Sequence, residues 1–137
     1  MYSRIVVPVD LDRLETLQKA LAVAGDLARH YGVPVTYVGV TGNVPDAVAR
    51  TPAEFGRKLQ HLADREATTH GITATAHPLT SPDPAADLSR VLRAAVRELG
   101  ADLVVMASHA PSPLDWIMPS QGGSVAEHSE ASVFIVR

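Results

Sequence analysis

A single aspartate stands where an apolar run ends, close to the start of the chain. Residues 5–9 are Ile, Val, Val, Pro and Val, and Asp10 follows them directly. Short apolar runs rich in β-branched residues are typical of strands that are buried on both faces. A carboxylate just beyond such a strand can accept a hydrogen bond from a ribose hydroxyl or from loop amides. The commoner role is to cap backbone N–H groups at a turn or helix start, and both interpretations stay open.

A glycine-rich segment near the other end of the chain is the second candidate. Residues 120–126 read Ser-Gln-Gly-Gly-Ser-Val-Ala, and we expect a short helix after Ser124. Glycines let the backbone turn sharply and expose N–H groups, while a helix N-terminus carries partial positive charge. The segment therefore suits an anion or a phosphate group. It equally suits a plain helix start capped by Ser124.

The sequence offers few other candidates for catalytic or metal-binding residues. Cysteine is absent, which excludes disulfides, thiol nucleophiles and thiolate metal sites. No GxGxxG, GxxxxGK[ST], GxSxG or HExxH motif is present, so we assign no catalytic and no metal-ligating residue. Two of the histidines, His61 and His70, are expected to face solvent. Arg90, Arg93 and Arg97 share one face of an expected helix; such a face is usually solvated, and an acidic partner is the alternative.

The elements that would position these groups follow two periodicities. Apolar runs predict strands at 5–9, 35–40, 72–79, 103–106 and 132–136, and 3.6-residue spacing predicts helices at 14–31, 52–69 and 84–99. Thr51-Pro52-Ala53-Glu54 is a capping box that marks the start of the second helix. Strand–helix alternation predicts an α/β fold: a three-layer α/β/α sandwich around a five-stranded, mostly parallel, doubly wound sheet. Ligands of such sheets bind beyond the carboxyl ends of the strands, where strand order reverses.

Length and composition set further bounds. The chain has 137 residues and a formal net charge of −3, which suits one domain over residues 1–137. We expect no nucleic-acid partner, because no basic block is present. We expect no membrane segment either, because no apolar stretch approaches the roughly 20 residues that a bilayer requires. The absence of cysteine and of a secretory signal leads us to expect a cytoplasmic protein.

Four ordered segments resemble the universal stress protein family. They are the first strand with its closing valine-aspartate pair (4–10), the fourth strand and the turn after it (101–109), the glycine-serine helix start (123–127) and the final strand (132–137). The resemblance implies an adenine nucleotide alpha hydrolase-like fold, a role in stress response, and binding of ATP or AMP, with Mg²⁺ accompanying ATP. It places these residues at the nucleotide: Pro8, Val9, Asp10 and Val40 beside the adenosine, Ala107, Ser108 and His109 along the crevice, and Gly123, Ser124 and Val125 at the phosphates.

The sequence departs from the family's phosphate loop. In nucleotide-binding members a glycine, two residues and a second glycine follow the fourth strand, and nine residues separate that glycine from a glycine-serine or glycine-threonine pair. Here Ala107 and Ala110 occupy the two glycine positions, and twelve residues, 111–122, separate Ala110 from Gly123. An alanine methyl strains a backbone that needs positive φ, and it blocks close approach to a phosphate. The remodelled loop leaves ATP binding open.

Three functional classes follow from the resemblance and its departures. The first is a regulator that binds ATP or AMP in the crevice. The second is a dimeric interaction module that has lost nucleotide binding and acts on an unidentified protein partner. The third is a slow ATP hydrolase. Because the family commonly dimerises through its last strand, we expect a homodimer formed by Ser132 to Arg137.

Overall fold

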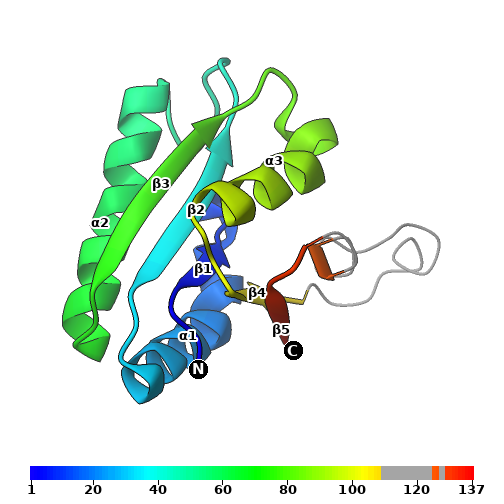
Figure 1. Cartoon of the computed structure of the whole chain (residues 1–137). Coiled ribbons are helices and arrows are strands. Elements are labelled where there is room, and N and C mark those ends of the chain that lie inside the picture. The colour runs from blue at the N-terminus through cyan, green and yellow to red at the C-terminus, as the bar shows by residue number, and fades with distance from the viewer. Residues whose placement is uncertain (109–124, 127–128) are drawn as a thin grey trace.

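The computed structural model describes residues 1–108, 125–126 and 129–137. Five strands form one sheet in the order β3-β2-β1-β4-β5, and every pairing between these described strands is parallel (Figure 1). The strands are β1 (Ile5–Pro8), β2 (Val35–Thr41), β3 (Ala74–Thr80), β4 (Leu103–Ala107) and β5 (Ser132–Val136). The described helical segments are η1 (Leu11–Leu17), α1 (Gln18–Tyr31), α2 (Pro52–His70) and α3 (Pro84–Glu98). The predicted doubly wound α/β fold is confirmed.

Alternating side chains of the central strand supply the two cores on either face of the sheet. Ile5 and Val7 of β1 belong to a cluster with α1 and α2, whereas Val6 belongs to a second cluster with α3. Successive side chains of a strand point to opposite faces, so a continuously apolar strand needs cover on both. The helices provide that cover, which yields the predicted three layers.

The ends of α2 are set by local sequence, as predicted. The Thr51 side chain accepts a hydrogen bond from the backbone N–H of Glu54 at 3.1 Å, and Pro52 occupies the first turn. The Glu54 carboxylate reaches back to the N–H of Arg50 at 3.1 Å, so two donors at the helix start are satisfied. Gly71 ends the helix with φ 65°, a left-handed conformation that glycine adopts without strain.

The first helix begins later than predicted. The apolar spacing predicts a helix from Leu14, but residues 11–17 form short 3₁₀ turns and the α-helix begins at Gln18. Arg13 interrupts the segment with φ −132° and ψ 38°, which is outside the helical region. The apolar residues Leu11 and Leu14 still pack on the core, so burial persists where regular helix does not. The periodicity of apolar residues indicates only that one face of a segment is buried. A kinked segment can bury the same residues as a regular helix.

Candidate functional site

The sheet opens between β1 and β4. On one side β1 pairs with β2 along its whole length, from Ile5↔Val35 to Pro8↔Val38. On the other side its pairing with β4 covers only Ile5↔Leu103 and Val6↔Val104. These neighbours are also the point where strand order reverses, because the chain runs from β1 toward β3 and then returns to β4. The carboxyl-terminal halves of the two strands therefore form the edge where a ligand crevice is expected.

Asp10 lies at this edge as an exposed helix cap. Its Oδ1 accepts a hydrogen bond from the N–H of Asp12 at 3.0 Å, and its carbonyl accepts one from Arg13 at 3.0 Å. The cap role considered from the sequence is thus confirmed. Within the described part of the chain, no other group bonds the Asp10 carboxylate. One oxygen holds η1 in place, and the other is available to a ligand.

The other predicted residues of β1 and β2 lie around Asp10. Val9 is buried, and its N–H donates to the carbonyl of Val38 at 2.8 Å. Pro8 and Val40 are half-buried at the ends of their strands. The backbone beneath Asp10 is therefore fixed by the sheet. This arrangement offers an apolar border next to one carboxylate, which suits an adenosine.

Across the opening, β4 contributes Ala107 and Ser108. Ala107 is paired with Val136 of β5, and the N–H of Ser108 donates to the carbonyl of Val136 at 2.7 Å. The side chain of Val125, a residue that the resemblance places at the phosphates, is fully buried in the α3-side core. Three further predicted residues, His109, Gly123 and Ser124, lie outside the described residues, as does Ala110. The structure thus brings the β1, β2 and β4 residues to one edge of the sheet.

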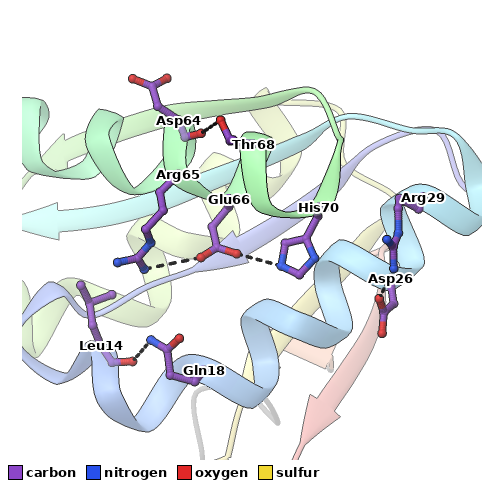
Figure 2. A network of polar contacts seen from close by, with 9 residues as sticks. All are labelled: Leu14, Gln18, Asp26, Arg29, Asp64, Arg65, Glu66, Thr68 and His70. Carbon is purple, nitrogen blue, oxygen red and sulfur yellow. Dashed lines mark hydrogen bonds and ion pairs between the residues drawn. The ribbon is translucent and has the colours of Figure 1, made fainter.

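A polar cluster between α1 and α2 was not predicted as such. Glu66 is only 5% exposed, and its carboxylate lies 3.0 Å from Nε2 of His70 and 3.5 Å from Nη2 of Arg65. Figure 2 shows Glu66 and His70 extending from α2 toward α1. The prediction that His70 faces solvent is wrong, because its side chain is 14% exposed and lies against Gly25 of α1. His61 is exposed, as predicted.

The spacing of α2 contains the signal that sequence reasoning missed. Leu59, Leu62, Ala63 and Glu66 follow the i, i+3, i+4, i+7 pattern of one helix face, and His70 continues it. A charged residue on such a face must be paired, which the contact with His70 achieves. The cluster lies between helix and helix, away from the strand ends. We therefore regard it as part of the fold.

Asp102 joins β1 to β4 at the opposite, amino-terminal end of the sheet. Its carboxylate accepts hydrogen bonds from the N–H groups of Ser3 and Arg4 and from the Ser3 hydroxyl, at 2.9 to 3.1 Å. Burial alone would raise the pKa of Asp102, but the hydrogen bonds from Arg4 and Ser3 outweigh it and hold the pKa below its ordinary value. Charge-assisted hydrogen bonds to the Asp102 carboxylate, the Asp102 clamp, therefore join the two strands at this end.

Two surface cavities among the described residues contain no predicted nucleotide residue. One, of about 540 Å³, lies between η1, the loop after β2 and α2, and it is lined by Leu11, Asp12, Leu14, Ala47, Val48, Glu54, Arg57, Lys58 and His61. The other lies beside α3. No group of three or more His, Asp or Glu side chains suited to a metal gathers within the described residues. Their helices include none long and apolar enough to cross a membrane.

Comparison with known proteins agrees with the geometry. The sequence model of the universal stress protein family matches residues 1–137. Universal stress protein G of Salmonella typhimurium is 32% identical over 145 residues, with all of both chains covered. A universal stress protein crystallised in complex with cAMP has a TM-score of 0.76 at 19% identity, covering 99% of this chain and 97% of its own. The Archaeoglobus fulgidus universal stress protein in complex with dAMP has a TM-score of 0.70 at 19% identity, covering 99% and 98%.

The family model matches the whole chain, and the Salmonella typhimurium relative is 32% identical over the full length of both proteins. The chain belongs to the universal stress protein family.

Proposed function

We propose that this protein binds an adenine nucleotide, ATP or AMP, in the crevice between the carboxyl ends of β1 and β4. One observation carries the proposal: pairing between these strands ends at Val6 and Val104, and the exposed carboxylate of Asp10 follows directly beyond β1. In this arrangement Asp10 accepts a hydrogen bond from a ribose hydroxyl, while Pro8 and Val40 border the base. Two relatives of the same fold were crystallised with adenine nucleotides, cAMP and dAMP.

The alanine at the first glycine position is compatible with this proposal. Ala107 closes β4 in extended backbone, and no non-glycine residue among those described has positive φ. Alanine therefore carries no backbone strain at 107, and it differs from glycine there only by one methyl group. The proposal expects this methyl to weaken phosphate contact without preventing adenosine binding.

Calorimetric titration with ATP and Mg²⁺, and separately with AMP, tests the proposal. We expect a micromolar dissociation constant, and we expect Asp10→Ser to weaken binding at least tenfold, because a hydrogen bond to a charged group contributes about 1.5–3 kcal/mol. Serine also caps helices, so η1 should persist in this variant. The matched control is Asp83→Ser, the same change at the cap of α3 beyond β3. No binding at millimolar nucleotide, or equal loss in both variants, contradicts the proposal.

The edge strand supports a second candidate function, a dimeric interaction module. Phe134 and Ile135 of β5 are 46% and 43% exposed, and β5 is the last strand of the sheet. An exposed apolar edge strand readily pairs with a second copy. We propose that Ser132 to Arg137 forms a homodimer. Light scattering at micromolar concentration should give twice the chain mass, and Phe134→Lys with Ile135→Lys should give monomers.

Both functions can be separated from slow hydrolysis in the same samples. The regulator binds nucleotide with no product formed, whereas a hydrolase releases phosphate when Mg²⁺ is present. The interaction module forms dimers and binds neither nucleotide. Measuring affinity, mass and released phosphate on one preparation therefore distinguishes the three classes.

A further inference from the structure

A cavity rich in arginine lies on the α3 side of the molecule, apart from the nucleotide crevice. Its volume is about 570 Å³, within the usual range for small-molecule sites. It is lined by Arg90, Arg93, Ala94 and Arg97 of α3 and by Ser129 and Glu130, which lie just before β5. Three arginines and one glutamate thus line the same cavity. None of these residues belongs to the crevice at β1 and β4.

The spacing of the three arginines places them together. They stand at i, i+3 and i+7 of α3, which puts them on one narrow face of the helix. A favourable interaction with the helix C-terminus explains Arg97, in the last turn, but not Arg90, in the middle of the helix. A solvated basic face explains exposure, but it does not explain a cavity that all three arginines line together.

An ion pair with Asp87 orients Arg90 and leaves other donors of its guanidinium group able to bind an anion. Its Nη2 lies 3.3 Å from Oδ2 of Asp87, and that carboxylate also accepts a hydrogen bond from the Ser81 hydroxyl at 2.7 Å. The Arg90 side chain is 67% exposed, so the ion pair is weak in water. A guanidinium has five donors, and one contact with Asp87 leaves others for a second anion. Arg90 is therefore oriented and still able to bind.

We propose that this cavity binds a small phosphate ester that also carries hydroxyl groups. The phosphate is bound by Arg90, Arg93 and Arg97, since guanidinium groups match phosphate oxygens in geometry and charge. The hydroxyl-bearing part lies toward Ser129 and Glu130. The Ser129 hydroxyl accepts from the N–H of Ala131 at 3.1 Å and so keeps its own proton to donate. Glu130 repels a second phosphate and accepts from ligand hydroxyls, which fixes the orientation of the ester.

Titration with glucose 6-phosphate, inorganic phosphate and glucose tests this site. We expect one equivalent of glucose 6-phosphate to bind, and we expect Arg93→Gln to weaken it about tenfold by removing charge-assisted hydrogen bonds. The matched control is Arg57→Gln on α2, across the sheet, which should bind as the unchanged protein does. Glu130→Gln should weaken glucose 6-phosphate but strengthen inorganic phosphate, because the neutral amide oxygen is a weaker acceptor for hydroxyls and the repulsive charge is removed.

The opposite responses of the two probes to Glu130→Gln keep the test decisive even if Arg93→Gln fails to fold. Asp10→Ser should leave glucose 6-phosphate binding unchanged, which separates this site from the nucleotide crevice. The proposal is overturned if glucose 6-phosphate does not bind at about 10 mM, a concentration that detects even weak sites. It is also overturned if Arg57→Gln weakens binding as much as Arg93→Gln, or if Glu130→Gln moves both probes in the same direction.

Discussion

Replacing Tyr37 by phenylalanine is expected to stabilise the protein by about 1 kcal/mol. The Tyr37 side chain is completely buried on β2, and among the described residues its hydroxyl has no hydrogen-bond partner. Burial raises the pKa of this hydroxyl, and the nearby charge of Glu66 raises it further. The hydroxyl is therefore buried without a hydrogen bond that would compensate for its lost hydration.

The size of the effect follows from two opposing terms. Burying a polar group without a partner costs about 1–3 kcal/mol, and phenylalanine removes that cost. Deleting one oxygen also leaves a small void. Because cores relax only partly around a void, the void lowers the net stabilisation. A net stabilisation of about 1 kcal/mol should raise the melting temperature by about 3–4 °C for a domain of this size.

Urea denaturation followed by far-ultraviolet circular dichroism gives the free energy of unfolding directly. The matched control is Tyr2→Phe, because Tyr2 is half-buried and its ring contact with Tyr31 does not need the hydroxyl. That variant should lie within about 0.5 kcal/mol of the unchanged protein. If Tyr37→Phe instead destabilises by 1 kcal/mol or more, the hydroxyl forms a stabilising bond and the reasoning is refuted.

Three further substitutions test the fold. Gly25→Ala should destabilise by about 1–3 kcal/mol although alanine favours helices, because the new methyl would lie 2.4 Å from the His70 ring; in a His70→Ala background, which lacks that ring, the same glycine change should cost nothing, and chemical denaturation measures both differences. Asp102→Asn should lower stability at neutral pH, measured by thermal melts across acid pH. Because the folded-state pKa of Asp102 is depressed, its contribution is present above the unfolded pKa and lost as pH falls through the folded value, so the two proteins should converge in acid. Thr51→Ala should cost about 1 kcal/mol by removing the cap of α2, and an unchanged denaturation midpoint would contradict that role.

The features predicted well from the sequence are those that neighbouring residues decide. β5 spans Ser132–Val136 in both prediction and structure, because a β-branched and aromatic run has few alternatives. The start of α2 was predicted from Thr51 and Glu54, whose capping bonds are local. The position of Asp10 beyond β1 was predicted for the same reason. At these places the physical cause lies within a few residues of its effect.

The features that were missed depend on residues far apart in the chain. His70 is largely buried because Gly25, on another helix, leaves room for its ring; the spacing of α2 places His70 on the buried face, but it does not show which residue lies opposite. The clamp at Asp102 requires Ser3 and Arg4 to lie next to it, which only the pairing of β1 with β4 brings about. The kink at Arg13 departs from a helix that periodicity predicts, since a short irregular segment buries the same apolar side chains.

The two ends of the β1–β4 pair differ in how the strands are joined. At the amino end, Asp102 bonds Ser3 and Arg4, and the strands pair directly above it. At the carboxyl end that pairing stops, and the exposed Asp10 holds only its own helical turn. Changes at the carboxyl end, such as alanine at 107, therefore alter the crevice without loosening the strand pair. The sheet can therefore keep the family fold while the sequence after β4 departs from the family pattern.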